Sequence, residues 1–339
     1  NMTEGIFMQH KWYNATEIEV GLNSKQIFYI ETIEVSRLSA LAFFAAGEKK
    51  YKGKRNYWQN REKTFTLVGL GHAYTIENNA SDARFDLVEQ HWKKLTSQIV
   101  QEDRHLQPIL FGGFTFDPQN EVSAEWTNFP QSYFTVATHQ LVIRNDKAYV
   151  TINYITDETN SANTFEALRK ERDELIHAAQ VKEVKTYAKP TMTSYMEPFK
   201  EEYLNSIHKV TSLIKDNEAQ KVVIARSLAL QFKEAITSPQ ILSHVVHEQP
   251  ESYLFGLEHG DLLFYGASPE RLVKVENGRA YSSCVAGSIK RGSTAEADEA
   301  LGQNLLNDMK NLGEHHYVVE MITETFEKNC SEVKVPHGP

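Results

Sequence analysis

Two charged side chains in the second half of the chain are placed where they could exchange protons with a ligand. Lys221 begins the segment KVVIARSLALQF, 221–232, and Glu270 follows Pro269. Pro269 fixes its own φ and favours an extended Ser268, which would hold Glu270 in one direction. A partly dry pocket lowers the pKa of a lysine and raises that of a glutamate, so the first could accept a proton and the second donate one. For each residue taken alone, a solvated charge at a strand end is the default interpretation.

The segment VAGSIKRG, 285–292, could bind an anion. Ala286 and Gly287 allow a close approach of the backbone, and exposed N–H groups there could hold a carboxylate. A tight turn before the next helix would account for the same residues. The segment is therefore a candidate binding loop, with a structural role as the alternative.

Glu314, next to His315 and His316, is a candidate metal ligand. The spacing is not HExxH, which argues against zinc. We expect Gly313 and Glu314 to begin the last helix, where the helix dipole favours an ionised carboxylate with or without a metal. The GLG at 69–71 lacks the rest of a dinucleotide-binding motif, and the chain has no Walker A, GxSxG or CxxC motif.

Composition limits the partners of the chain. Its 339 residues include 36 basic and 45 acidic side chains, a formal charge of −9, so we expect no binding to nucleic acid. A small anionic ligand would need local cations or a metal. The chain has no long apolar run and no signal-peptide pattern. Its only cysteines, Cys284 and Cys330, suggest no disulfide framework. We expect a cytoplasmic monomer without a membrane partner.

Hydrophobic periodicity predicts alternating strands and helices. Strands are expected at 26–34, 64–70 and 221–232, and helices at 81–100 (capped by Ser81), at 161–180 and after Pro198. The last two helices are expected at 294–311 and 314–328. Hairpins are expected in three places: 139–144 with 148–155 around Asn145–Asp146, 253–258 with 261–265 around His259–Gly260, and 271–276 with 279–285 around Asn277–Gly278.

Consecutive hairpins imply antiparallel pairing, so the predicted class is α+β, with large antiparallel β-sheets flanked by helices. We expect an N-terminal α+β region, 1–190, and a second region, 191–339, that carries the candidate residues. The two are expected to form one intertwined domain. Composition and spacing alone leave the activity open.

Four segments in order add a family resemblance. They are KVVIAR (221–226), YGASPERLV (265–273), VAGSIKRG (285–292) and LLNDMKNLGEHHYVV (305–319). Each is weak alone, but together they resemble the chorismate-binding enzymes, which include isochorismate, salicylate, anthranilate and aminodeoxychorismate synthases. YWQNREKTFTLVGLG (57–71) and ILFGGFTFDP (109–118) look like the isochorismate synthase version of the N-terminal half.

The resemblance implies a role for each candidate residue. Lys221 matches the lysine that activates water to attack C2 of chorismate, and Glu270 matches the glutamate that protonates the departing C4 hydroxyl. Glu314 matches a Mg²⁺ ligand. Ala286, Gly287 and Ser288 match the loop that contacts the substrate, although many members have threonine in place of Ser288. Mg²⁺ would bind the C1 carboxylate of chorismate.

The resemblance favours a Mg²⁺-dependent isochorismate synthase of the menaquinone type. The VAGS loop differs from the PIKGT loop of aminodeoxychorismate synthases, which favours water as the nucleophile. The long region before Lys221 looks more like the menaquinone branch than the shorter siderophore branch. The alternatives are a salicylate synthase, a siderophore-pathway isochorismate synthase and a non-catalytic chorismate-binding module. Family members continue past the position of Pro339, with a second Mg²⁺ carboxylate, a substrate-binding arginine and a glycine-rich loop. We therefore expect this chain to lack its C-terminal part and to be nearly inactive as given.

Overall fold

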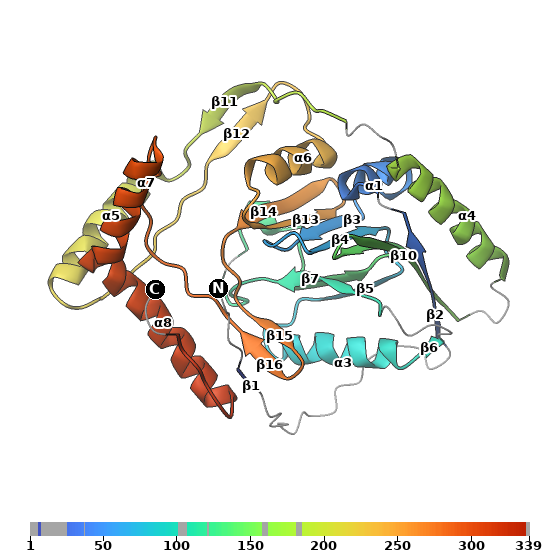
Figure 1. Cartoon of the computed structure of the whole chain (residues 1–339), viewed down its shortest axis with the longest axis horizontal. Helices are drawn as coiled ribbons and strands as arrows, with labels where there is room; N and C mark the ends of the chain where they lie inside the picture. The colour runs from blue at the N-terminus through green and yellow to red at the C-terminus, as the bar shows by residue number, and fades with distance from the viewer. Residues whose placement is uncertain are drawn as a thin grey trace. The chain divides into compact units, whose positions relative to one another are not determined.

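The computed structural model describes residues 6–7, 26–36, 38–100, 107–120, 122–157, 162–180 and 185–336. The chain divides into two compact units (Figure 1). The sheet unit comprises Trp12–Tyr187 and Thr237–Pro269, and the helix unit comprises Asn1–Lys11, Ala188–Ile236 and Glu270–Pro339. That regions 1–190 and 191–339 form one intertwined domain stays a prediction.

The sheet unit is built on an eight-stranded sheet of order β14-β13-β3-β4-β9-β10-β2-β6. Neighbouring strands are antiparallel except β2 and β6, which run parallel. The predicted large antiparallel sheet is confirmed. The strands are β2 (Ile27–Val35), β3 (Arg55–Gln59), β4 (Phe65–Leu70), β6 (Ile99–Val100), β9 (His139–Arg144), β10 (Lys147–Thr156), β13 (Tyr253–His259) and β14 (Leu262–Ser268).

The hairpin between β9 and β10 forms where its turn residues predict it. Asn145 and Asp146 have φ of 48° and 68°, the two left-handed residues of a type I′ turn. Arg144 pairs with Lys147 across the turn. This fixes the register in which Leu141 and Val150 face each other and are both fully buried.

Helices cover one face of this sheet (Figure 1). Phe43 and Phe44 of α1 pack with Tyr57 and Val68 from the sheet and with Leu242 of α6. In the covering helices, apolar side chains recur at helical spacing and so lie on the helix face that packs on the sheet. The elements are α1 (Ala40–Ala46), α2 (Glu48–Tyr51), α4 (Ala162–Ala179) and α6 (Ser238–Glu248).

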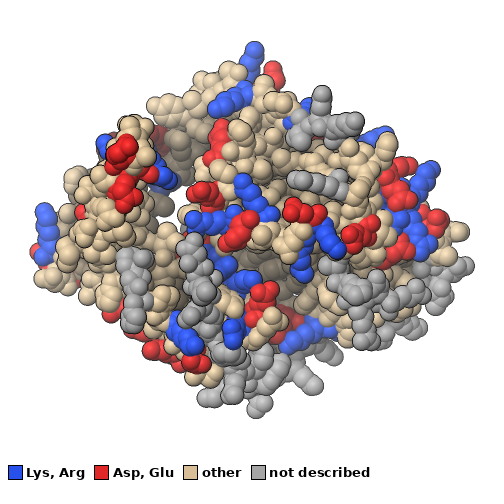
Figure 2. Space-filling model, viewed as in Figure 1, with Lys and Arg blue, Asp and Glu red and all other residues tan. Residues whose placement is uncertain are grey.

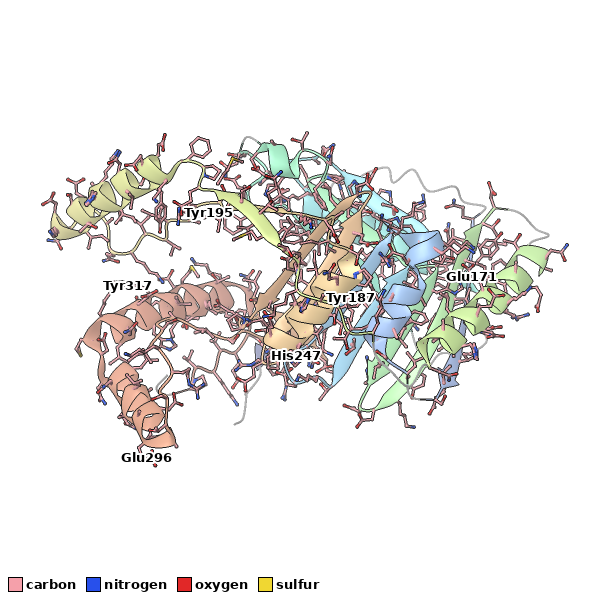
Figure 3. All side chains as sticks on the ribbon, turned by 90° about the horizontal axis from the view of Figure 1, so that it is seen from above. Glu171, Tyr187, Tyr195, His247, Glu296 and Tyr317 are labelled. Atoms are coloured by element: carbon pink, nitrogen blue, oxygen red, sulfur yellow. The ribbon has the colours of Figure 1, made fainter. Side chains whose placement is uncertain are left out.

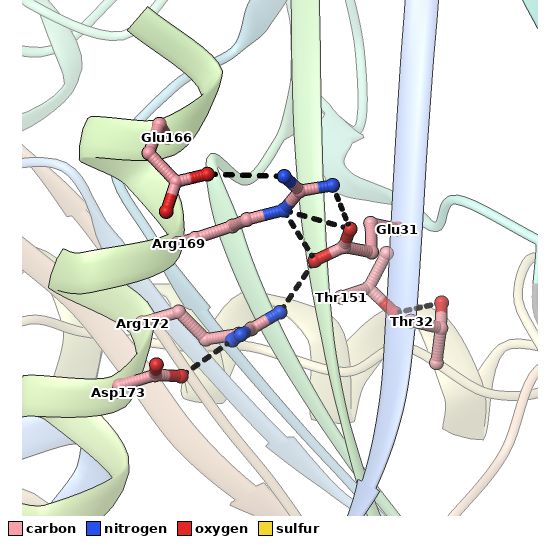
Figure 4. A network of polar contacts seen from close by, with 7 residues as sticks. All are labelled: Glu31, Thr32, Thr151, Glu166, Arg169, Arg172 and Asp173. Atoms are coloured by element: carbon pink, nitrogen blue, oxygen red, sulfur yellow. Dashed lines mark hydrogen bonds and ion pairs between the residues drawn. The ribbon is translucent and has the colours of Figure 1, made fainter. Parts of the chain in front are cut away.

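Ion pairs tie α4 to strand β2. Glu31 on β2 accepts hydrogen bonds from Arg169, with its Nη2 at 2.6 Å, and from Arg172, with its Nη1 at 2.6 Å (Figure 4). These guanidinium groups outweigh the effect of partial burial and lower the pKa of Glu31. Glu166 and Asp173 complete the network on the solvent side.

The opposite side of the unit carries a three-stranded sheet, β5 (Tyr74–Asn78), β8 (Ser132–Val136) and β7 (Leu110–Phe114), together with helix α3 (Arg84–Thr96). Phe28, Leu95 and Val136 form its core. The prediction of one helix over 81–100 capped by Ser81 was wrong at both ends. The N-cap position is Ala83, and Ile99 pairs with Phe28 as part of β6.

A buried ion pair joins strands β3 and β13. Arg55 Nη2 lies 2.7 Å from Glu258 Oε1, and the two side chains are 1% and 3% exposed. Glu258 Oε2 also accepts hydrogen bonds from Arg55 Nε and from the Gly53 backbone, both at 2.8 Å. Such a pair stays buried only because nearly every charged atom has a partner.

Within its described residues, the helix unit has three long helices and two small sheets. The helices are α5 (Lys200–Lys215), α7 (Ala295–Asn307) and α8 (Met309–Asn329). Strand β11 (Met192–Met196) pairs with β12 (Ala229–Phe232), and β1 (Ile6–Phe7) pairs with β16 (Arg279–Tyr281), which pairs with β15 (Lys274–Glu276). Asn277 and Gly278, with φ of 51° and 74°, form the predicted turn between β15 and β16.

Several predicted bounds in this unit need correction. The helix predicted over 294–311 ends at Asn307. The strand predicted over 221–232 is formed only at Ala229–Phe232, and 221–228 is irregular. Its partner β11 ends at Met196, because Pro198 lacks an N–H and leads into α5. The last helix begins at Met309, not at Gly313, because Asp308 caps it by accepting a hydrogen bond from Asn311 N at 2.8 Å.

Candidate active site

The predicted binding loop, 285–292, is fixed at its C-terminal end by Asp298 in the first turn of α7. Asp298 Oδ1 accepts hydrogen bonds from Gly292 N at 2.7 Å and from Arg291 Nε at 2.8 Å. Its Oδ2 accepts one from Arg291 Nη2 at 2.5 Å. Arg291, and then the Gly292 amide, lower the pKa of Asp298 to about 2. The carboxylate is therefore ionised, and it holds the loop to the start of the helix, where the dipole also favours it.

Two glycines of the loop lie close against helices, where an added side chain would force a neighbour to shift. A Cβ on Gly292 would lie 2.2 Å from the backbone nitrogen of Asp298. Gly287 has a φ of +88°, and a Cβ there would lie 2.9 Å from Asn311 Oδ1. The loop therefore packs on α7 at one end and on α8 at the other, with Ala286 and Ser288 flanking the second contact.

Helix α8 also brings together two predicted site residues. Glu314 lies three positions after Asn311 and so on the same face of α8. Its Oε1 is 3.1 Å from Lys221 Nζ, and the two side chains are 37% and 30% exposed. The sequence predicted both residues for the site but not this pairing.

The segment of Lys221 is also bound to the start of α5. Arg226 Nη2 lies 3.1 Å from Glu197 Oε1, and Lys200 Nζ lies 2.6 Å from Glu197 Oε2. These two cations, Lys200 foremost, lower the pKa of Glu197. The Arg226 guanidinium also lies over the Tyr203 ring, 5.5 Å from its centroid. The irregular stretch 221–228 is thus held by charge and ring contacts in place of a β-ladder.

Glu270 lies beside the start of the binding loop. Ser282 Oγ donates to Leu272 O at 2.7 Å, and Arg271 N donates to Ser283 Oγ at 3.4 Å, so the segment after Glu270 runs along the strand end before the loop. Burial, and next the charge of Glu270, raise the pKa of the Cys284 thiol. All six predicted residues therefore belong to the helix unit. A cleft shared by Lys221 and Glu270 stays a prediction.

The candidate metal donors are a carboxylate and an amide on one helix face. In the described part of the chain, no group of three or more His, Cys, Asp or Glu is arranged to hold a metal ion. His316 pairs with Glu320 one turn along α8, with Nε2 and Oε1 3.1 Å apart. Glu314 and the Asn311 amide oxygen fit Mg²⁺, which usually takes one or two protein carboxylates and keeps several waters. Glu314 lies in the second turn of α8, where the helix dipole has little effect on its charge.

A cavity of about 420 Å³ in the sheet unit is a poor site for a charged ligand. Among the described residues it is lined by apolar side chains and glycines, including Trp58, Phe134 and Phe255. A carboxylate ligand needs cationic or N–H donors, which the binding loop of the helix unit can offer.

Sequence reasoning missed Asp298, Arg291 and Asn311. The sequence did carry a signal for Asp298. It lies in an acidic first turn that follows Thr294, and the structure shows the Thr294 hydroxyl capping this helix.

Figure 3 shows Glu296 at the N-terminal tip of α7 and Tyr317 on α8. The contacts of Arg291 and Asn311 join separate elements, so local patterns could not reveal them. On the face seen in Figure 2, both signs of charge are intermixed over each unit.

The chain matches known proteins along nearly its whole length. A family model described as chorismate binding enzyme matches residues 15–339. The chain is 36% identical over 339 residues to isochorismate synthase MenF of Bacillus subtilis, covering 97% of this chain and 70% of that protein. It is 27% identical over 323 residues to the salicylate biosynthesis isochorismate synthase of Pseudomonas aeruginosa, covering 93% of this chain and 65% of that one.

Solved structures show the same fold. MenF, the menaquinone-specific isochorismate synthase from Escherichia coli, superposes with a TM-score of 0.69 at 20% identity, covering 91% of this chain and 65% of that one. Anthranilate synthase component I from Streptococcus pneumoniae gives a TM-score of 0.56 at 17% identity, covering 78% and 62%. The chain thus spans somewhat less than two thirds of these solved relatives. Fold, family model and sequence identity agree, and the chain belongs to the chorismate-binding enzymes.

Proposed function

We propose that this protein is an isochorismate synthase, an isomerase that moves the hydroxyl of chorismate from C4 to C2. The observation that carries the proposal is the 36% identity to a MenF isochorismate synthase over 97% of the chain. The geometry supports it, because Lys221 meets α8 at Glu314, one helical turn from the contact between the binding loop and Asn311.

Three residues or groups divide the reaction between them. Lys221 takes a proton from water as the water oxygen bonds to C2. The ring double bonds C1=C2 and C5=C6 shift to C1=C6 and C4=C5, and the C4–O bond breaks. Glu270 gives its proton to the departing hydroxyl, which leaves as water, so atoms and charge balance. The loop residues Ala286, Gly287 and Ser288 bind the substrate through backbone N–H groups and the serine hydroxyl.

Mg²⁺ is the proposed cofactor, and Glu314 is its carboxylate ligand. When bound, the ion supplies positive charge against the C1 carboxylate of chorismate, which offsets the formal charge of −9 locally. Glu314 is more than one-third exposed, so an ion with its water shell can approach its carboxylate from solvent.

We further propose that the enzyme acts as a cytoplasmic monomer in menaquinone synthesis, with chorismate as its partner. The higher identity to MenF than to the Pseudomonas salicylate-pathway enzyme favours this pathway. Within the described ranges, no helix has the length and apolarity needed to cross a membrane.

Product analysis tests the proposal. The full-length gene product is incubated with chorismate and Mg²⁺, with an EDTA-treated sample as control, and the products are identified by liquid chromatography and mass spectrometry. Isochorismate alone is expected. Salicylate with pyruvate would identify a salicylate synthase, and Mg²⁺-dependent binding of chorismate without turnover would identify a binding module.

A further inference from the structure

The proposed roles of Lys221 and Glu314 require each to face another partner. The lysine must reach a water next to the substrate ring, and the carboxylate must reach a metal ion. The structure joins them instead, with Nζ and Oε1 3.1 Å apart. Glu314 lies in the second turn of α8, away from the unpaired N–H groups of the helix start, so the ammonium is the cation that the structure gives it.

We propose that Lys221 occupies the metal site as the counter-ion of Glu314, and that a divalent cation binds only by displacing it. The inference rests on the proposed function solely in assigning the metal to Glu314. An ammonium and a divalent ion repel each other strongly at contact distance, so Glu314 holds one or the other. Metal binding thereby releases the Lys221 side chain, and the lysine becomes available to the substrate in the metal-loaded enzyme.

The exposure of the pair makes this exchange feasible. Both side chains keep about a third of their surface in contact with solvent, at 30% and 37%. Exposed ion pairs are weak, so an incoming ion has little to overcome, whereas a buried pair would resist separation. The neighbouring anchor of the same segment, Arg226 with Glu197, also has a separation of 3.1 Å and does not involve Glu314.

Metal titration without turnover tests the competition. Mn²⁺ suits the same oxygen donors as Mg²⁺, and its free concentration is read from its electron paramagnetic resonance signal. The full-length protein, Lys221→Met and Lys221→Arg are titrated with Mn²⁺, and Mg²⁺ is then added to displace it. Arg226→Met is the matched control, since it removes a cation from the same segment at the same distance from its carboxylate.

The Lys221→Met variant should bind Mn²⁺ about two- to five-fold more tightly than the wild type, the range set by the strength of exposed pairs. Lys221→Arg and Arg226→Met should bind with wild-type affinity. Glu314→Gln should weaken binding more than about ten-fold. Circular dichroism confirms that each variant is folded.

The two possible failures are distinct. Unchanged affinity in Lys221→Met, with binding lost in Glu314→Gln, overturns the competition and leaves the metal assignment standing. Binding that is indifferent to Glu314→Gln overturns the assignment of the metal to Glu314. Tighter binding in Arg226→Met equal to that in Lys221→Met would mean that general charge, not the contact with Glu314, controls the affinity, and would also overturn the proposal.

Discussion

Lys221 forms a partly exposed ion pair with Glu314, so its contribution to folding stability can be measured separately from its contribution to catalysis. An ion pair with side chains 30% and 37% exposed adds little to the free energy of unfolding. We therefore predict that Lys221→Ala unfolds at nearly the wild-type temperature but loses isochorismate formation by about 10²–10⁴-fold, as expected for a general base. Paired measurements of kcat/KM and thermal unfolding check this, and normal turnover would rule out the proposed base.

Glu270 should separate binding from turnover. Glu270→Gln keeps the shape of the side chain but cannot supply a titrating proton, so chorismate should still bind while kcat falls by about 10²–10⁴-fold. Equilibrium dialysis against chorismate and steady-state kinetics measure the two quantities. Glu276→Gln, in the neighbouring strand β15, serves as the control. A wild-type kcat in Glu270→Gln would exclude the acid role.

The resemblance identified the candidate residues, but not their contacts. Lys221 with Glu314, and Gly287 with Asn311, are contacts between separate elements, and no local pattern encodes them. The sequence predicts a helix that begins at Gly313 and Glu314. The helix begins further upstream, because Asp308 supplies the cap.

At the scale of elements, the anchoring of the loop by Asp298 should appear in substrate affinity. Asp298→Asn keeps the size of the side chain but weakens the hydrogen bonds from Arg291 and Gly292. We predict that KM for chorismate rises about ten-fold, roughly the loss of one charge-assisted hydrogen bond, with a smaller change in kcat. Glu299→Gln, in the next position of α7, is the control. An unchanged KM in Asp298→Asn would show that the anchor does not shape the binding loop.

Elements were predictable where local chemistry decides them. The turns at Asn145–Asp146 and Asn277–Gly278 need left-handed residues, and both formed as predicted. Element ends that depend on partners were not predictable. Residues 221–228 alternate like a strand, but Pro198 removes the strand they would pair with, and Ile99 continues a helical pattern yet joins β2 as β6.

For the molecule as a whole, stability towards acid should depend on Glu171. Its Oε2 lies 2.7 Å from Lys50 Nζ and 3.5 Å from Nε2 of the buried His139. Partial burial raises its pKa, but His139, Lys50 and Tyr51 outweigh this and lower the pKa to about 2. A depressed pKa stabilises the fold above the ordinary value of 4.5, and this stabilisation is lost as pH falls from there towards 2.

We therefore predict that Glu171→Gln unfolds more easily at pH 7, by about 1–3 kcal/mol, and that its deficit relative to the wild type shrinks as pH approaches 2. Urea unfolding at a series of pH values measures both effects. Glu174→Gln, an exposed site on the same helix, is the control. A deficit that is constant with pH would show that the charge of Glu171 is not the stabilising feature.

The ion pair between Arg55 and Glu258 has a consequence for the order in which a nascent chain can fold. Arg55 leaves the ribosome early, but its carboxylate partner and the strands β13 and β14 are made only after the whole of Ala188–Ile236, which belongs to the other unit. Until then β3 has an open edge, which favours aggregation, and Arg55 has Glu48 but not the buried Glu258 as its acidic partner. This protein should therefore depend most on chaperones while residues 188–253 are being translated.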